Sequence, residues 1–220
     1  MTDKIIQYIK KNRVSTTEIA DCLGKTGAVE KVAPVNRGHF KVGKIKYVYA
    51  VNESNWSVHE QIVDTHENEI VFIDSFNCHD RAVIGELVSK YILLYMQANA
   101  IVTVSPMRDA AALIRENYPI WCNGFNPNGC FNVKIDLDDE ALIVQIKKRF
   151  DYYNESIAVC DDCGVVIIPK EYHNKDFYDK IVNIEKQEDI WFDRLDRYKE
   201  NTFEIVCLKK YLNDSKYYNQ

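Results

Sequence analysis

Two short motifs carry side chains whose types and spacing could do chemistry together. Arg108 is followed directly by Asp109, and Gly85 is followed directly by Glu86, about one helix earlier in the chain. A guanidinium can hold an anion through paired hydrogen bonds, and carboxylates can hold a hard cation. The order and spacing of these residues predict a pocket that binds an anionic substrate and a cation at the same time.

The elements around these motifs follow an α/β pattern. Continuous apolar runs predict buried strands over 70–74 and 100–104, and apolar residues at helical spacing predict helices over 82–97 and 107–117. This order predicts right-handed βαβ connections in a layered α/β domain. The Gly85 turn then lies at a helix start, where free backbone N–H groups as far as Leu87 and Val88 can bind a carboxylate.

The rest of the chain predicts peripheral helices and a strand-rich second half. Thr2 is expected to cap an amphipathic helix, a capping box opens a helix at Ser15, and a second box is expected at Ser57. A long charged helix is expected to begin at Asn174. The further predicted strands cover residues 45–51, 131–137, 142–146, 156–159 and 165–168.

Composition limits the number of domains and the class of partner. The chain has 220 residues, of which 46% are hydrophobic, so it can bury one sizeable core, and we expect a single domain over 1–220. The net charge is −5 and no long basic block occurs, so direct nucleic-acid binding is not expected. The chain lacks a secretory signal pattern and an apolar run long enough to span a membrane, which predicts a cytoplasmic protein.

The cysteines predict free thiols. Seven cysteines, an odd number, are spread from Cys22 to Cys207, and a reducing compartment disfavours a disulfide framework. Cys160 and Cys163 form a Cys-x-x-Cys pair, but a structural zinc site needs a second pair at a compatible distance, and none is evident in the sequence. Zinc is therefore not expected.

Taken in order, the motifs resemble one known family. They are the run from Ser15 to Gly24, the strand ending at Asp74, Gly85-Glu86-Leu87, Met107-Arg108-Asp109, Gly124-Phe125-Asn126-Pro127, and the Asp-rich turn before Gly164. This ordered set resembles the family of the regulator of ribonuclease activity A (RraA) and the class II 4-hydroxy-4-methyl-2-oxoglutarate aldolases. The resemblance covers about residues 15–170, and a C-terminal helical extension over about 174–212 is similar in kind to that of longer members.

The resemblance implies a fold and an assembly. The fold would be a three-layer β/β/α swivelling domain of the RraA-like type, with peripheral N-terminal helices and a long C-terminal helix. The assembly would be a homotrimer, or a hexamer built as a dimer of trimers. The active site would lie in a cleft between adjacent subunits, so that one chain alone would lack a complete site.

The resemblance also implies roles for individual residues. A divalent ion, Mg²⁺ or Mn²⁺, would act on a 2-oxo acid, with Asp109 holding it directly or through water and Arg108 binding the substrate oxygens. Glu86 would order metal-bound water. Its distance from Arg108 is one residue longer than the aldolase pattern of Asp, twenty residues, Arg-Asp, and an extra residue between Leu93 and Ala98 could absorb the offset.

Further residues enter as candidates from the same resemblance. Gly85, Leu87 and Val88 would lie against the substrate carboxylate, and His79, on the loop that borders the pocket, could donate to a substrate carboxylate or serve as an acid. Glu185 or Glu188 could reach the site of a neighbouring subunit. For each of these residues a structural reading stays open, as a first-turn charge, a turn glycine, a surface histidine or a solvated helix face.

The resulting functional hypothesis is a metal-dependent lyase. It would cleave a C–C bond adjacent to a 2-oxo acid, by retro-aldol release of pyruvate or by decarboxylation of oxaloacetate. One alternative is an RraA-type regulator that binds a ribonuclease, although the regulator-type sequence lacks the Asp after its Arg. Another is a diverged member acting on a sugar-acid-like substrate, since Val104-Ser105-Pro106 replaces the family's usual Asp-Gly pair and Tyr152-Tyr153-Asn154-Glu155 replaces its Pro-Gly-Asp turn.

Overall fold

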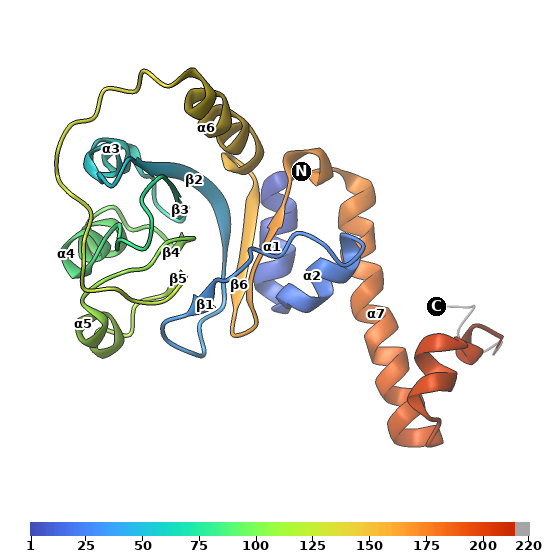
Figure 1. Cartoon of the computed structure of the whole chain (residues 1–220). Coiled ribbons are helices and arrows are strands. Elements are labelled where there is room, and N and C mark those ends of the chain that lie inside the picture. The colour runs from blue at the N-terminus through green and yellow to red at the C-terminus, as the bar shows by residue number, and fades with distance from the viewer. Residues whose placement is uncertain (214–220) are drawn as a thin grey trace.

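The computed structural model describes residues 1–213, and its strands form one strongly curved sheet (Figure 1). Residues 214–220 of the expected single domain lie outside this description. The order across the sheet is β1-β5-β4-β3-β2-β6-β7, in which β2, β3, β4 and β5 are parallel and β1, β6 and β7 pair antiparallel. The strands are β1 (Ala33–Pro34), β2 (Lys41–Val51), β3 (Ile70–Phe76), β4 (Ala100–Thr103), β5 (Ile120–Cys122), β6 (Ile157–Asp161) and β7 (Gly164–Ile168).

The sheet nearly closes on itself because β2 belongs to two strand layers. Residues 41–44 pair with β6, and residues 45–51 pair with β3. Near the opposite edges of the sheet, the Val29 N–H donates to the Val165 carbonyl at 2.9 Å. The enclosed core is largely aromatic and aliphatic, which explains why the strand sequences read as continuous apolar runs.

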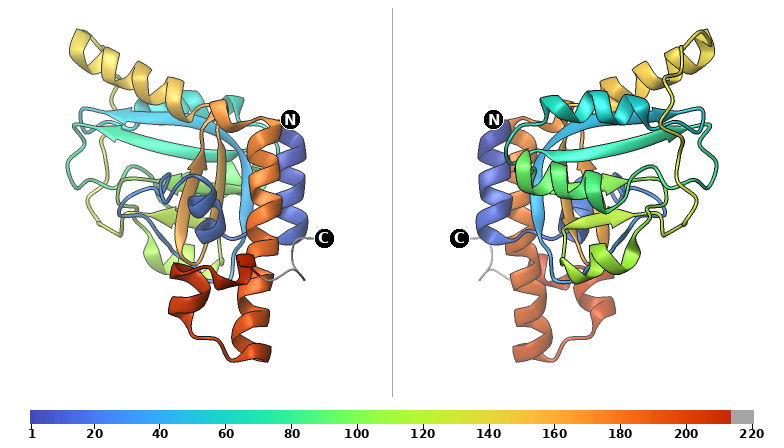
Figure 2. Two further views of the ribbon diagram at one scale, coloured as in Figure 1. Left: turned by 90° about the vertical axis from the view of Figure 1, so that its right-hand side faces the viewer. Right: turned by 90° about the vertical axis from the view of Figure 1, so that its left-hand side faces the viewer.

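Helices cover the curved sheet on two sides (Figure 2). On the side of the parallel strands lie α3 (Trp56–Gln61), α4 (Glu86–Lys90) and α5 (Ala110–Arg115), and on the side of β6 and β7 lie α1 (Thr2–Asn12), α2 (Thr16–Cys22) and α7 (Lys175–Tyr198). This arrangement confirms the predicted three-layer α/β fold with peripheral N-terminal helices and a long C-terminal helix. None of the helices within residues 1–213 combines the length and apolarity of a membrane span.

Short helical turns and one further helix complete the elements. After α7 the chain folds back as η4 (Phe203–Cys207) and η5 (Lys210–Asn213), so the C-terminal extension is not one continuous helix. The remaining elements are η1 (Ile62–Asp64), η2 (Tyr91–Tyr95), α6 (Glu140–Tyr153) and η3 (Lys170–Tyr172).

Two of the four predicted helix caps are confirmed, whereas Thr2 is the first residue of α1 and Met1 is its N-cap. The Ser15 side chain accepts from the Glu18 N–H, and the Glu18 carboxylate accepts from the Ser15 N–H, which is a complete capping box. Asn174 accepts the Phe177 N–H at the start of α7. The box predicted at Ser57 is wrong, because α3 already begins at Trp56 and the Ser57 hydroxyl donates to a carbonyl of β2.

Two predicted strands and two predicted helix ranges need correction. Residues 142–146 lie inside α6, whose start is capped by Asp139, and Leu142 and Ile146 face the core at helical spacing. A short β-branched apolar run fits either structure by periodicity alone. Residues 131–137 form no regular strand; Phe131 makes an isolated bridge with Ser54, and the Ser54 hydroxyl donates to the Val133 carbonyl. The helices predicted over 82–97 and 107–117 begin later, at Glu86 and Ala110.

An ion pair between the buried Asp74 and the partly exposed Arg149 joins α6 to the sheet, and its removal should destabilise the protein. Arg149 Nε donates to Asp74 Oδ2 at 2.6 Å, and the Tyr47 hydroxyl donates to the same oxygen at 2.9 Å. Burial, followed by the nearby Asp74 carboxylate, raises the pKa of Tyr47. Asp74→Ala should lower the free energy of unfolding in urea by about 2 to 3 kcal/mol, less than for a fully buried pair because the Arg149 side chain is 39% exposed.

The matched control removes a carboxylate of the same kind from an exposed loop. Asp138 precedes α6 and is exposed, so Asp138→Ala should leave the urea midpoint nearly unchanged. A loss for Asp74→Ala of less than about 1 kcal/mol would mean that the pair contributes no more than an exposed one.

Candidate functional site

The candidate site is built from loops that follow the parallel strands at one edge of the sheet. The Arg108 N–H donates to the Ile84 carbonyl at 3.1 Å, which joins the loop after β4 to the loop after β3. The Met107 N–H donates to the Gly124 carbonyl at 3.0 Å, which joins the loop after β4 to the loop after β5. The carboxyl edge of parallel strands is the usual place for a ligand site in an α/β sheet.

Asp109 has an unusual backbone conformation that points its carboxylate toward α4. Its φ of 62° and ψ of 35° lie in the left-handed region, which a non-glycine residue adopts at a cost on the order of 1 kcal/mol. Asp109 is the N-cap residue of α5, but its side chain makes no capping hydrogen bond to that helix. Instead, its Oδ2 accepts the Glu86 N–H at 3.0 Å and lies 3.7 Å from the Arg108 Nε. Gly85-Glu86 and Arg108-Asp109, separate in sequence, thus form one cluster.

Two glycines allow Arg108 and Asp109 to lie where they do. A Cβ at Gly85 would lie 2.2 Å from Asp109 Oδ2 and 2.8 Å from Arg108 Cγ. A Cβ at Gly129 would lie 2.8 Å from Arg108 Nη1. Gly85 has φ −142°, which any residue can adopt, so close approach and not backbone freedom requires glycine here. The Arg108 side chain therefore passes close to two backbone segments, with Cγ near Gly85 and Nη1 near Gly129.

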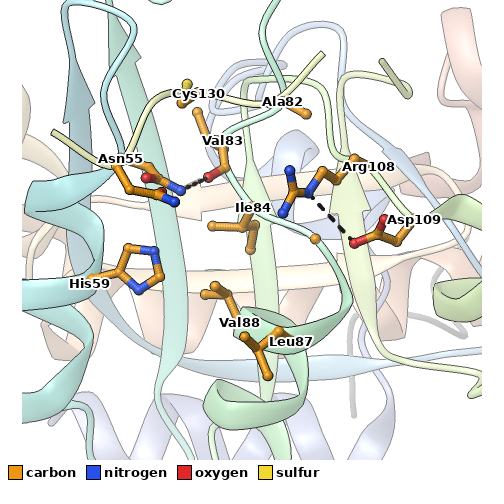
Figure 3. A pocket seen from close by; sticks show the side chains of 13 residues that line it. Asn55, His59, Ala82, Val83, Ile84, Leu87, Val88, Arg108, Asp109 and Cys130 are labelled. Atoms are coloured by element: carbon orange, nitrogen blue, oxygen red, sulfur yellow. Dashed lines mark hydrogen bonds and ion pairs between the residues drawn. The ribbon is translucent and has the colours of Figure 1, made fainter. Parts of the chain in front are cut away.

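These residues border a cavity of about 120 Å³ (Figure 3). That volume suits a small organic acid better than a nucleotide or a drug-sized ligand. Five of its lining residues were predicted from sequence: Gly85, Leu87, Val88, Arg108 and Asp109. The others are Asn55, His59, Ala82, Val83, Ile84, Gly129, Cys130 and Asn132.

Asn55 contributes an acceptor that has no partner within residues 1–213. Its side chain is buried, and its Nδ2 donates to the Val83 carbonyl at 2.9 Å, which fixes the orientation of the amide. Its Oδ1 has no hydrogen-bond partner among the described residues. A buried acceptor without a partner is costly, so a bound donor such as a hydroxyl would satisfy it. His59, one turn later on α3, lines the same cavity.

Comparison with known protein families shows to which family the chain belongs. The sequence profile described as RraA-like, Aldolase/RraA, matches residues 16–167. The chain belongs to the RraA-like family. A search of curated protein sequences finds no significant match.

Solved structures of low sequence identity share the RraA-like fold. An uncharacterised protein from Pseudomonas syringae pv. tomato has a TM-score of 0.71 at 17% identity, covering 94% of each chain. RraAS2 from Streptomyces coelicolor, titled an unusual member of the RNase ES inhibitor RraA family, has a TM-score of 0.63 at 14% identity, covering 85% of this chain and 93% of that one. The Thermus RNA-processing inhibitor RraA has a TM-score of 0.52 at 16% identity, covering 70% and 92%.

The one-residue offset at Glu86, relative to the aldolase spacing of the RraA-like family, coincides with a π-helical turn. In η2 the Met96 N–H donates to the Tyr91 carbonyl at 3.0 Å, five residues back. A π turn accommodates one extra residue within a helix. The Glu86 backbone consequently still lies against Asp109, but its carboxylate is 3.7 Å from Arg115 and does not line the cavity.

The other candidate residues lie away from the cavity of their own chain. His79 is on the loop after β3 but is not a lining residue. Glu185 and Glu188 lie on α7, beyond β6 and β7 and across the sheet from α4 and α5 (Figure 1). Glu185 accepts the Tyr8 hydroxyl, and burial followed by this contact raises the pKa of Tyr8 to about 12. Burial, followed by the charge of Glu18, raises the pKa of Glu188.

The donor set fits a hard divalent ion only with additional ligands. Asp109 places a carboxylate oxygen at the first turn of α4, and the Glu86 carboxylate lies 3.7 Å from Arg115. No group of three His, Cys, Asp or Glu side chains that could hold a metal occurs among residues 1–213. Mg²⁺ and Mn²⁺ commonly keep several waters and use one or two carboxylates, so Asp109 could serve such an ion, whereas the Glu86 carboxylate lies outside the cavity and would need a bridging water. Asp109 and Glu86 do not form a tetrahedral zinc site.

Proposed function

We propose that this RraA-like protein is a divalent-metal-dependent lyase that cleaves a C–C bond adjacent to a 2-oxo acid. The observation that carries the proposal is the Arg108 side chain, which passes between Gly85 and Gly129 and places its Nε 3.7 Å from the Asp109 carboxylate at a small cavity. A fixed cation and a carboxylate next to a space of this size suit a small acid that binds together with a metal ion. Retro-aldol cleavage and oxaloacetate decarboxylation both need this arrangement.

Arg108 would stabilise the charge that develops on the substrate. In retro-aldol cleavage the 4-hydroxyl loses a proton, the C3–C4 bond breaks, and its electrons pass to the 2-oxo acid as an enolate, which takes up a proton at C3. A guanidinium fork placed at the enolate oxygens lowers the energy of this step. The N–H groups of Leu87 and Val88 lie in the first turn of α4, have no carbonyl partner within that helix, and would bind the carboxylate.

Asn55 would bind the substrate hydroxyl, and His59 would remove its proton. The unpartnered Asn55 Oδ1 would accept this hydroxyl, and the His59 imidazole would accept its proton and return it. Asp109, with Glu86 through water, would hold Mg²⁺ or Mn²⁺. When bound, the ion supplies a Lewis acid to the 2-oxo carbonyl.

A second copy of the chain would complete the site. Next to the cavity mouth, Leu87 is 81% exposed, and Leu94, Tyr95 and Ile114 are also exposed on α4, η2 and α5. Contiguous exposed apolar side chains commonly mark a protein interface. A homotrimer or hexamer that covers them would bring a neighbouring Glu185 or Glu188 within reach of the metal's water.

A cytoplasmic location is proposed from the thiols. All seven cysteines are free, and Cys163 and Cys207 are exposed, which suits a reducing compartment.

The RraA-type regulator is the competing proposal. It draws support from the structural neighbours described as inhibitors of RNA processing. Arg108 followed by Asp109 at a cavity favours the enzyme, since a surface-binding regulator has no need of either feature. A pull-down with an RNase E-type ribonuclease separates the two, because the lyase proposal expects no capture.

The lyase proposal is tested by its dependence on metal. Pyruvate release from 4-hydroxy-2-oxo acids and oxaloacetate should require Mg²⁺ or Mn²⁺ and should stop with EDTA. Asp109→Asn should raise the Mg²⁺ concentration for half-maximal rate by at least about tenfold, because a carboxylate ligand is lost. Glu116→Gln, an exposed carboxylate just after α5, serves as the control. Turnover that is unaffected by EDTA and by Asp109→Asn would contradict the proposal.

A further inference from the structure

One wall of the cavity is a segment without regular secondary structure. Residues 128–132, called here the wall segment, contribute Gly129, Cys130 and Asn132 to the lining. Backbone hydrogen bonds attach the wall segment to two neighbouring loops, including Cys130 N–H to the Ala82 carbonyl at 2.9 Å. Because neither a helix nor a strand supports it, its position depends on such individual contacts.

Arg81 makes the side-chain contacts that hold the wall segment from behind. Its Nη1 donates to the Gly129 carbonyl at 3.0 Å, and its Nε donates to Glu53 Oε1 at 2.7 Å. Its guanidinium carbon lies 4.4 Å from the centroid of the Phe131 ring. The hydrogen bond from Arg81 lowers the pKa of Glu53, so this carboxylate stays ionised and opposite the guanidinium. Arg81 itself does not line the cavity.

Gly129 links Arg81 to the proposed substrate-binding guanidinium. A methyl group added at Gly129 would lie 2.8 Å from Arg108 Nη1, so the guanidinium passes close to the Gly129 backbone with no room for a side chain between them. If the wall segment moved, the Arg108 guanidinium would either be displaced by Gly129 or lose its contact with the Gly129 backbone. An anion-binding fork depends on its geometry as much as on its charge.

We propose that Arg81 is a positioning residue, which fixes Gly129 against Arg108 and so sets the affinity of the cavity for a planar dicarboxylate or 2-oxo acid. The inference rests on the proposed function. This inference goes beyond the proposed function because it assigns an effect on substrate binding to an arginine that would touch neither substrate nor metal. The charge of Arg81 is opposed by Glu53, so Arg81 acts through geometry and not as a second anion-binding group.

The test measures binding of oxalate in the presence of Mg²⁺ by calorimetry. Arg81→Met should weaken oxalate binding by at least about tenfold, since the contact to the Gly129 carbonyl is lost. Arg81→Lys should recover part of the affinity, because an ammonium can donate to this carbonyl but lacks the fork. Glu53→Gln is the matched control: its amide oxygen still accepts from Arg81, so oxalate should bind nearly as in the wild type.

A second measurement follows Arg108 directly. The ¹⁵N NMR signal of the Arg108 Nε–H group, assigned with Arg108→Lys, should shift in Arg81→Met and Arg81→Lys without oxalate, and stay in place in Glu53→Gln. If both Arg81 variants keep the wild-type affinity and the wild-type Arg108 signal, the inference is overturned. If the wild type binds no oxalate with Mg²⁺, the proposed function is contradicted, while the Arg108 signal still decides the inference. Should Arg81→Met fail to fold, Arg81→Lys carries both measurements.

Discussion

Replacing Arg108 by alanine should lower kcat/KM for pyruvate release by about 1,000-fold. Removal of one fixed donor to a developing oxyanion commonly costs 100- to 1,000-fold, and Arg108 supplies two donors and a full charge. The cavity-lining residues include no other Lys or Arg that could take its place. The measurement is a coupled pyruvate assay at saturating Mg²⁺, with kcat and KM determined separately.

Two further variants separate the geometry of Arg108 from its charge. Arg108→Lys keeps the charge but loses the fork, and it should recover no more than about a tenth of the wild-type rate. Arg37→Ala removes an exposed arginine that does not line the cavity and should leave both constants unchanged. Full activity in Arg108→Ala would exclude this guanidinium from the reaction and with it the lyase mechanism.

The buried strands and the peripheral helices could be predicted because their signals are local. Residues 70–74 and 100–104 read as continuous apolar runs since both faces of β3 and β4 are covered. The prediction at 142–146 was wrong because a run of Leu, Ile and Val fits a strand as well as a helix, and the Asp139 cap decides for the helix. β5 was missed because it has only three residues.

The proposed site was predicted only in part. The residues that form short sequence motifs were found, and those brought to the cavity by tertiary packing were not. Arg108, Asp109 and Gly85 stand out in the sequence, and strand order alone places their loops at one edge of the sheet. Asn55 and His59 were missed, because they lie at the start of α3 and on it, after β2, and reach the cavity through tertiary packing such as the contact of Asn55 with Val83. Their spacing of four residues was the only available signal.

Gly85→Ala should abolish most of the activity while leaving the fold intact. The added Cβ would lie 2.2 Å from Asp109 Oδ2 and 2.8 Å from Arg108 Cγ, so both side chains must move and the Glu86 N–H must lose its acceptor. We expect kcat/KM to fall by about 100-fold or more, because misplacement of a catalytic group by about 1 Å can cost that much. The φ of −142° is open to alanine, so backbone strain should be small.

Gly24→Ala is the control for Gly85→Ala, because it is expected to lower stability and leave activity unchanged. Gly24 follows α2 with φ +74°, and a Cβ there would meet nothing within 4 Å. Alanine in this left-handed conformation costs about 1 to 2 kcal/mol of stability without touching the cavity. Thermal unfolding and pyruvate release should therefore separate: Gly24→Ala loses stability and keeps activity, whereas Gly85→Ala loses activity at a nearly unchanged melting temperature. If Gly85→Ala stays active, the contact among Gly85, Arg108 and Asp109 cannot be the arrangement that performs the reaction.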